Sequence, residues 1–173
     1  SNYYIEAKNI QNLKNEIFKN PSKDHQQITN LIDKFSGQVS GESIIEKNQV
    51  EIKEIFEQEN IEEILNKTYS LSQNGSEFSK NTEHELKGKS PTSLKITFKQ
   101  IHMATEMSLR DALIMEYRMV QRCQASGDFY EGVRAMLVDK DRNPQWKPSN
   151  LDKVDEIWVN HFFEPLHEKD LKI

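Results

Sequence analysis

Apolar residues recur along this chain at the three- and four-residue spacing of amphipathic helices. The widest apolar face covers residues 109–123. A shorter set follows the i, i+3, i+4, i+7 pattern closely: Ile28, Leu31, Ile32 and Phe35. No stretch of four or more residues alternates convincingly between apolar and polar positions, as a half-buried strand does. The pattern therefore predicts an all-α fold of about eight helices, most of them near ~10–14 residues long, with essentially no sheet.

Helix-start and helix-stop signals agree with this pattern. Ser90 precedes Pro91, the order expected of an N-cap followed by proline at the first helical position, where its missing N–H is not needed. Gly127 lies between two apolar segments and is predicted to end the first of them as a left-handed residue. Two further pairs have the three-residue spacing of capping boxes: Ser108 with Asp111, and Asp128 with Glu131.

The composition of the chain changes near its middle. Residues 1–89 are rich in Lys, Asn, Gln and Glu, whereas all five Met and both Trp lie between 90 and 163. A length of 173 residues fits one domain or two small helical lobes. We therefore expect an N-terminal helical part (1–89) and a C-terminal helical part (90–173), joined near 87–90 within one compact helical domain.

Charge and hydrophobicity exclude several classes of function. The net charge is −5 and the pI is near 5.6, whereas nucleic-acid binding requires a basic face. No apolar run approaches the ~18 residues of a membrane span, so we expect neither nucleic acid nor a membrane as a partner. The single cysteine, Cys123, excludes an internal disulfide and favours a reducing compartment. Because the chain begins Ser1-Asn2 without Met, we interpret it as a fragment of a longer parent protein.

The residue types that carry chemistry form no recognisable motif. His161 and His167 flank Pro165, which breaks the helix between them and argues against a shared metal. Cys123 and His102 could be imagined as a nucleophile and its base, but Cys123 falls on an apolar helix face, where a packed thiol is favoured. The glycines are too dispersed for a phosphate-binding loop. The residues therefore predict no catalytic group, no metal and no cofactor in this chain.

Carboxylates are abundant, and two pairs can be nominated as general acid and base: Asp111 with Glu116, and Asp128 with Glu131. Helix caps and solvated helix faces explain these carboxylates better. Glu116 and Arg118 lie in mid-helix beside methionines, where an internal charge pair is favoured over catalysis. Physical reasoning alone therefore reaches only a helical module.

Several segments of the second half are more specific than a generic helix. In chain order they read SPTSLKIT (90–97), LIMEYRM (113–119), DFYEGVRAMLVDKD (128–141) and PQWKP (144–148). This series resembles the C-terminal part of the 3-hydroxyisobutyryl-CoA hydrolases, a branch of the crotonase (enoyl-CoA hydratase) superfamily. The Phe-x-Glu-Gly-x-x-Ala core is similar to the C-terminal helix of the superfamily in general. The EYR and PQWKP segments point to the hydrolase branch.

The resemblance implies an active site outside this chain. Crotonases hold the thioester carbonyl in an oxyanion hole of two backbone N–H groups from an N-terminal sheet core, and the hydrolase branch adds a Glu and an Asp. No segment here resembles those parts, so we expect this chain to pack over the core, to make subunit contacts and to be inactive by itself. The implied partners are the missing core, the acyl-CoA substrate through the parent protein, and further copies in a homo-oligomer. The family also implies a mitochondrial location.

The resemblance assigns a binding role to two residues at most. In enoyl-CoA hydratases the helix after Glu-Gly supplies an aromatic residue and a lysine to the CoA nucleotide. Met136 takes the aromatic position, and Lys140 lies one residue beyond the position of the lysine. Both are candidate CoA contacts, with core packing of Met136 and a solvated Lys140 as the alternatives.

Two functions from different classes remain open. The first is the C-terminal helical domain of a 3-hydroxyisobutyryl-CoA hydrolase, which acts on a branched hydroxyacyl-CoA in valine breakdown. The second is a helical protein-interaction module from a catalytically dead crotonase homologue. Glycine-rich turns and the two carboxylates in an upstream sequence would decide for the first.

Overall fold

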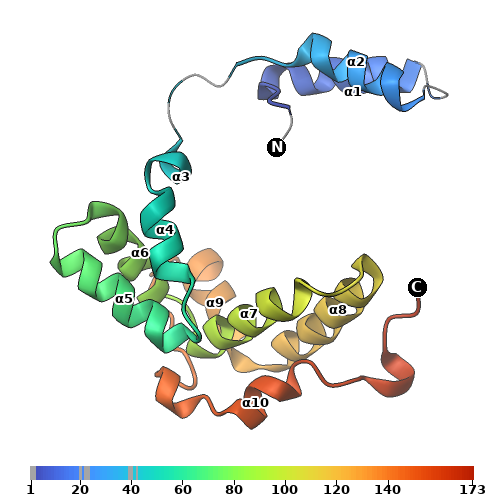
Figure 1. The fold of residues 1–173 in the computed structure, drawn as a ribbon. Coiled ribbons are helices and arrows are strands. Elements are labelled where there is room, and N and C mark those ends of the chain that lie inside the picture. The colour runs from blue at the N-terminus through green and yellow to red at the C-terminus, as the bar shows by residue number, and fades with distance from the viewer. Residues whose placement is uncertain (1–2, 20, 22–23, 39–40, 42) are drawn as a thin grey trace. The chain divides into compact units, whose positions relative to one another are not determined.

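The computed structural model describes residues 3–19, 21, 24–38, 41 and 43–173, and the chain divides into two compact units, residues 1–48 and 49–173 (Figure 1). The described residues form ten α-helices, one π-helical turn and two 3-10 turns, and they contain no strand. The all-α prediction is therefore confirmed. The number of helices exceeds eight because three helices have only 4, 7 and 6 residues: α3 (Ile44–Lys47), α9 (Gly127–Val133) and α10 (Glu156–His161).

The first unit consists of two amphipathic helices, α1 (Ala7–Lys19) and α2 (His25–Phe35), followed by the short helix α3. The side chain of Asp24 caps α2 by accepting a hydrogen bond from the backbone N–H of Gln27. α1 and α2 contact each other, but among their described residues only Leu31 is buried. This unit therefore has little core of its own.

The second unit begins with α4 (Gln49–Phe56), α5 (Ile61–Gln73) and α6 (Glu77–Lys87), of which α5 and α6 pack along each other (Figure 1). A cluster of buried isoleucines joins α4 and α5: Ile55, Ile61 and Ile64. Partly buried side chains from α5, α6 and the next helix surround it: Leu71, Phe78, Leu86, Leu94 and Phe98. Burial of these side chains stabilises this half of the unit.

The other half of the second unit contains α7 (Pro91–Ala104), α8 (Leu109–Ala125) and α10. They share a second buried cluster: Ile96, Met115, Met119, Val154, Val159 and Phe162. Leu94 and Phe98 of α7 pack against the first cluster, whereas Ile96 belongs to the second. α7 is therefore held from both sides.

Two of the predicted helix starts are confirmed. The Ser90 hydroxyl accepts a hydrogen bond from the Ser93 N–H at 3.1 Å, and Pro91 is the first residue of α7. The Ser108 hydroxyl likewise accepts from the Asp111 N–H at 3.2 Å at the start of α8, although the reciprocal half of the predicted capping box is replaced by a bond of 2.6 Å from the Ser108 hydroxyl to the Asp111 carboxylate. Both signals are local, so the sequence was sufficient to find them.

The predictions for Gly127 and for an Asp128–Glu131 capping box are wrong. Ser126 ends α8 in an extended conformation, and Gly127 is the first residue of α9, with a φ outside the left-handed region. No side chain caps α9. Asp128 is unavailable as a cap because residues far away in the sequence bind its carboxylate, as described below.

Arginines of α8 hold the C-terminal segment. Nε of Arg118 donates to the two carboxylate oxygens of Asp170 at 2.8 and 3.0 Å. Nε of Arg110 donates to the backbone carbonyl of Ile173 at 2.8 Å. Arg118 therefore forms its ion pair with Asp170 of the C-terminal segment and not with a neighbouring helix as expected, while Glu116 accepts a hydrogen bond from the amide of Gln100 in α7.

The composition change near 87–90 lies at the turn between α6 and α7, inside the second unit. The division into parts 1–89 and 90–173 stays a prediction. Among the described helices, none combines the length and the apolar character that a bilayer span requires.

Candidate functional site at the turn after helix α9

α9 continues directly into a π-helical turn, η1 (Arg134–Val138). The turn closes with a hydrogen bond of 2.8 Å from the N–H of Asp139 to the carbonyl of Arg134. Such wide turns are rare and often occur at functional sites. The chain then folds back, because the N–H of Arg142 donates at 3.0 Å to the carbonyl of Ala135, whose side chain is fully buried. The segment after η1 is therefore packed against the turn.

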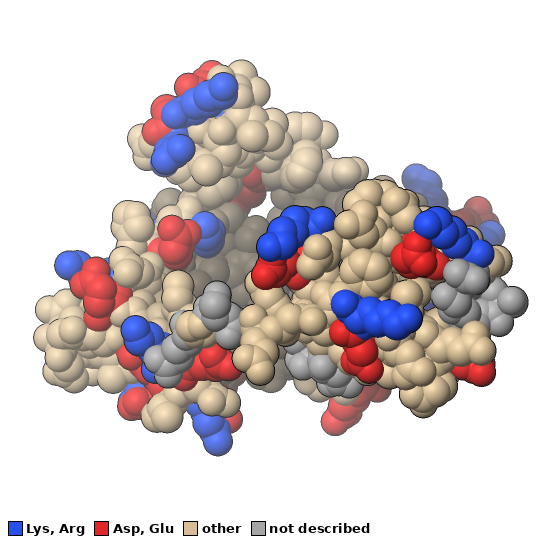
Figure 2. Space-filling view, turned by 90° about the horizontal axis from the view of Figure 1, so that it is seen from above, with Lys and Arg blue, Asp and Glu red and all other residues tan. Residues whose placement is uncertain are grey.

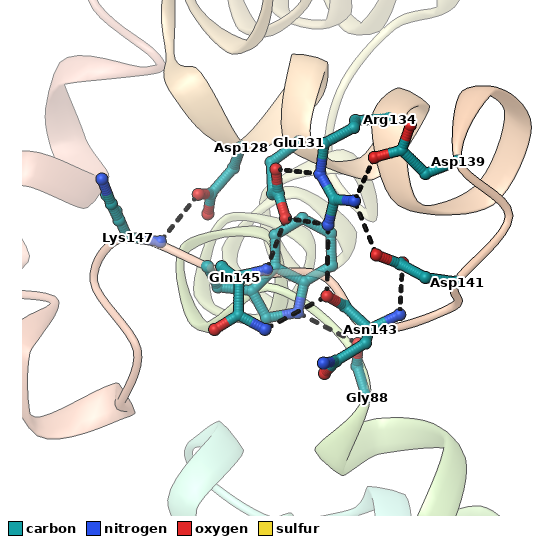
Figure 3. Close-up of polar contacts among 10 residues, drawn as sticks. Gly88, Asp128, Glu131, Arg134, Asp139, Asp141, Asn143, Gln145 and Lys147 are labelled. Atoms are coloured by element: carbon teal, nitrogen blue, oxygen red, sulfur yellow. Dashed lines mark hydrogen bonds and ion pairs between the residues drawn. The ribbon is translucent and has the colours of Figure 1, made fainter.

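Arg134 is the centre of the polar contacts in this turn (Figure 3). Its Nε and Nη2 atoms donate to the two carboxylate oxygens of Glu131 at 2.9 and 2.7 Å, a two-point contact of the strong charge-assisted kind. Its Nη1 atom donates to Asp139 at 2.7 Å and to Asp141 at 2.6 Å. Nη2 also reaches the carbonyl of Asn143 at 3.2 Å. One guanidinium therefore ties together the helix, the turn and the returning segment.

These contacts fix the charge state of the carboxylates. The Arg134 guanidinium, with help from the Gln145 N–H at 2.6 Å, lowers the pKa of Glu131 from 4.5 to about 2. The same guanidinium and the N–H of Asn143 lower the pKa of Asp141. Glu131 is therefore ionised at neutral pH and already engaged, which is unsuitable for a general acid or base.

Asp128 fastens the turn to the start of α7. Its side chain is buried, with 8% of the residue exposed. One carboxylate oxygen accepts from the Ser90 hydroxyl at 2.6 Å and the other from the N–H of Lys147 at 2.9 Å, 38 and 19 positions away in the sequence. Because the Ser90 hydroxyl also caps α7, three segments meet at this carboxylate.

Trp146 closes the same junction. Its indole N–H donates to the carbonyl of Gly88 at 3.1 Å. A Cβ atom at Gly132 would lie 3.4 Å from the Trp146 ring, an ordinary contact distance, so the indole packs directly over this position. Three of the four segments that carried the family resemblance, 90–97, 128–141 and 144–148, therefore meet in one packing arrangement. Sequence reasoning missed this arrangement, and its only signal was the run of charges at 131, 134, 139 and 141.

The two candidate CoA contacts lie on and just after η1. Met136 is 54% exposed, so it is not a core residue. Lys140 is exposed, with a φ of 57°, and no hydrogen bond or ion pair joins it to the described residues. Leu137 and Val138 between them are each 68% exposed. Exposed apolar side chains at 136–138 are therefore followed closely along the chain by the Lys140 ammonium, on a turn that the hydrogen bonds of Arg134 stabilise. The CoA role of Met136 and Lys140 stays a prediction.

The remaining candidates do not assemble into a catalytic group. Burial raises the pKa of the Cys123 thiol, the opposite of what an activated nucleophile needs. Nδ1 of His102 lies 2.9 Å from the carbonyl of Phe98, and Nδ1 of His161 lies 2.8 Å from a carboxylate oxygen of Glu164. Within the described ranges, no three or more metal-binding side chains gather at one place.

Charged side chains of both signs are interspersed on the face shown in Figure 2. Among the described side chains on this face, no continuous patch of one sign is visible.

Comparison with known proteins identifies the family. The enoyl-CoA hydratase/isomerase family model matches residues 1–163 of this chain. The chain belongs to the enoyl-CoA hydratase/isomerase family. The match begins well before residue 90, so the N-terminal helices are also part of the family pattern.

Curated relatives match nearly the whole of this enoyl-CoA hydratase/isomerase chain. The mitochondrial 3-hydroxyisobutyryl-CoA hydrolases of Gallus gallus and Danio rerio are 37% and 35% identical over 99% of the chain. The enzyme of the same name from Homo sapiens is 34% identical over 98% of the chain. The matched region is 45%, 45% and 44% of these relatives, so the chain spans less than half of their length.

Two solved structures share the helical arrangement. A carnitinyl-CoA dehydratase from Mycobacterium thermoresistibile matches with a TM-score of 0.81 over 99% of this chain and 46% of its own, at 22% identity, which establishes the fold alone. An enoyl-CoA hydratase from Rhodobacter sphaeroides matches with a TM-score of 0.71 over 86% of this chain and 44% of its own, at 26% identity. The helical fold therefore occurs as part of longer chains of known structure.

Proposed function

We propose that this chain is the C-terminal helical region of a mitochondrial 3-hydroxyisobutyryl-CoA hydrolase and that it supports a catalytic core supplied by the rest of the parent protein. The observation that carries the proposal is the turn fastened around Arg134. It joins residues 128–141, which resemble the superfamily in general, to residues 144–148, which resemble the hydrolase branch, and its carboxylates are occupied by structural donors. The names of the curated relatives support the choice of substrate.

The chemistry of thioester hydrolysis explains why this chain would support a catalytic core and not contain one. In thioester hydrolysis, the oxygen of water adds to the carbonyl carbon, the C–S bond breaks, and the CoA thiolate takes up a proton. Backbone N–H groups stabilise the oxyanion, and a carboxylate assists the water. Glu131, with a pKa of about 2, is too weak a base for that work. In this proposal the oxyanion donors and the working carboxylates belong to the part of the parent protein outside this chain.

Met136 and Lys140 are the residues that we assign to the nucleotide end of CoA. A methionine side chain can pack against the adenine, and a lysine ammonium can pair with a phosphate. The hydrogen bonds of Arg134 would hold both side chains at a fixed spacing. We also propose that the parent protein is a homo-oligomer located in mitochondria, and light scattering of the purified protein tests its subunit number.

A thiol-release assay with 3-hydroxyisobutyryl-CoA tests the proposed activity. The parent protein should hydrolyse this thioester. The 173-residue chain alone should release no thiol above the uncatalysed rate, because each missing oxyanion donor removes a factor of about 10²–10³. Turnover by this chain alone would contradict the proposal. A folded parent protein without turnover would instead favour the interaction module of a catalytically dead homologue.

The CoA contacts are tested in the same parent protein. Met136→Ala and Lys140→Ala should raise KM and leave kcat unchanged, because both residues lie away from the reacting carbon in this proposal. Lys153→Ala is the matched control, since Lys153 is an exposed lysine in the 3-10 turn η2 (Leu151–Lys153). Equal KM values in all three variants would remove the CoA role of Met136 and Lys140.

A further inference from the structure

Two basic side chains on the segment after η1 have no partner. Lys140 and Arg142 are both exposed, and no hydrogen bond or ion pair joins either side chain to the described residues. The carboxylates on either side of Lys140, those of Asp139 and Asp141, bind Arg134 instead (Figure 3). Two cations, two positions apart in the sequence, therefore remain available to an external anion.

The backbone at these two cations has an uncommon conformation. Lys140 has a φ of 57° and Arg142 has a φ of 55°, in the left-handed region that residues with a Cβ atom rarely adopt. The contacts of Arg134 and the hydrogen bond of 3.0 Å from the N–H of Arg142 to the carbonyl of Ala135 hold this shape. Backbone strain persists only where the surrounding structure fixes it, and it concentrates at active sites and at ligand clamps. The conformation therefore indicates a binding role.

Backbone donors of the same segment are also free. Asp139 lies in the right-handed helical region, with φ −79° and ψ −27°, and Lys140 follows it with a positive φ. Successive residues of opposite hand turn their N–H groups to one side and form a concave site for an anion. Among the described residues, no acceptor binds the N–H of Lys140 or that of Asp141. Two N–H groups therefore accompany the two cationic side chains.

We propose that Lys140 and Arg142 bind the 3′-phosphate of CoA, and that Arg142 makes the site selective for CoA over its 3′-dephospho form. The inference rests on the proposed function, which assigns Met136 and Lys140 to the nucleotide end of CoA. A terminal phosphate monoester carries close to two negative charges at neutral pH. Two cations match that dianion, and the planar guanidinium of Arg142 can bind two of its oxygens at once. We refer to Lys140 and Arg142 as the phosphate clamp.

The exposed methionine beside the phosphate clamp fits the same orientation of the ligand. Met136 is 54% exposed and precedes Lys140 by four positions. In CoA the 3′-phosphate is attached to the ribose that carries the adenine. An adenine on Met136 and a phosphate on the phosphate clamp are therefore adjacent groups of one nucleotide.

Two cavities of the second unit are less suited to a phosphate. The apolar cavity along α7, of about 670 Å³, is walled mainly by apolar side chains such as Ile96. A second cavity, of about 430 Å³, includes Lys95 and Lys99. Lys95 pairs with Glu62 at 2.7 Å. Lys99 donates to the side-chain oxygen of Asn160. Among the described residues, neither cavity therefore offers two unengaged cations.

The substrate selectivity of the parent protein tests the phosphate clamp. Thiol release is measured with 3-hydroxyisobutyryl-CoA and with its 3′-dephospho analogue. The analogue should have a KM higher by at least about tenfold and the same kcat, because the lost contacts are charge-assisted and remote from the reacting carbon. Equal KM values for the two substrates would overturn the proposal.

Variants of Arg142 assign the selectivity to this side chain. Arg142→Ala should raise the KM for 3-hydroxyisobutyryl-CoA by about tenfold and leave the KM for the dephospho analogue unchanged. Arg142→Lys keeps the charge but loses the two-point contact, so its KM should lie between those of the parent protein and Arg142→Ala. Lys153→Ala is the control and should keep both KM values, since Lys153 is exposed and lies outside this segment. An equal rise for both substrates in Arg142→Ala would overturn the proposal.

Binding without turnover separates the phosphate clamp from the proposed activity. Calorimetric titration of the parent protein with adenosine 3′,5′-bisphosphate and with adenosine 5′-monophosphate measures the contribution of the 3′-phosphate. Tighter binding of the bisphosphate that is lost in Arg142→Ala, in a parent that hydrolyses no 3-hydroxyisobutyryl-CoA, would support the phosphate clamp and remove the proposed function. Hydrolysis with a KM that does not depend on the 3′-phosphate would keep the proposed function and overturn the phosphate clamp.

Discussion

The buried carboxylate of Asp128 gives the sharpest test of the fastened turn. It binds the Ser90 hydroxyl at the start of α7 and the N–H of Lys147 in the returning segment. Asp128→Ala removes both acceptors and leaves two donors without a partner. Asp128→Asn keeps the shape and one acceptor oxygen but removes the charge.

The expected loss of stability follows from these contacts. A hydrogen bond to a charged group contributes about 1.5–3 kcal/mol, so Asp128→Ala should lower the free energy of unfolding by about 3–6 kcal/mol. Asp128→Asn weakens the contact with Ser90 and should cost about 1–2 kcal/mol. For a chain of this size, each kcal/mol lowers the melting temperature by about 2–4 °C.

Circular dichroism during heating and urea titration of this chain measures both variants. Asp155→Ala is the matched control, because Asp155 is an exposed aspartate that accepts a single N–H, that of Trp158 at 2.7 Å, as the N-cap of α10. Loss of this cap should cost about 1 kcal/mol. The order of stability should therefore place Asp128→Ala well below both Asp155→Ala and Asp128→Asn.

Two results would refute this reasoning. If Asp128→Ala is no less stable than Asp155→Ala, the carboxylate does not hold the three segments together. If Asp128→Ala keeps its stability but abolishes thioester hydrolysis in the parent protein, Asp128 acts in the chemistry and the assignment of a structural role is wrong.

Three further predictions concern the same part of the chain. Arg134 lowers the pKa of Glu131 from an ordinary 4.5 to about 2. The contact between these two side chains therefore stabilises the fold above pH 4.5, and this stabilisation is lost as the pH falls from 4.5 to 2. Glu131→Gln should flatten the pH dependence of the urea midpoint in that range. Gly132→Ala should raise the free energy of unfolding by about 0.5–1 kcal/mol, because it removes a glycine from a helix and the new Cβ lies 3.4 Å from the indole ring, an ordinary contact distance. Gly132→Leu should lower the free energy of unfolding. A destabilised alanine variant would contradict the observed packing. Arg118→Gln removes the ion pair with Asp170 and should accelerate tryptic cleavage in the segment after α10, as mass spectrometry of the fragments would show; unchanged cleavage would mean that this pair does not hold the segment.

The sequence by itself determined the features that depend on neighbouring residues. Apolar spacing places helices correctly because a helix face repeats every three to four residues. Ser90, Pro91 and Ser108 mark helix starts because a cap bonds to an N–H only three residues away. A local signal also gave the wrong prediction for Gly127. The glycine was expected to end α8, but Ser126 ends that helix and Gly127 begins α9.

Only the tertiary structure decided what the family segments do. The partners of Asp128 lie 38 and 19 positions away, and that of Arg118 lies 52 positions away. Whether a carboxylate is a cap, a base or a structural acceptor depends on which donors the folded chain brings to it, and no local pattern carries that information. The exposure of Met136 and the apolar cavity along α7 could not be predicted from the sequence for the same reason. A helical period shows which residues share a face, but what covers that face depends on packing between elements far apart in the chain.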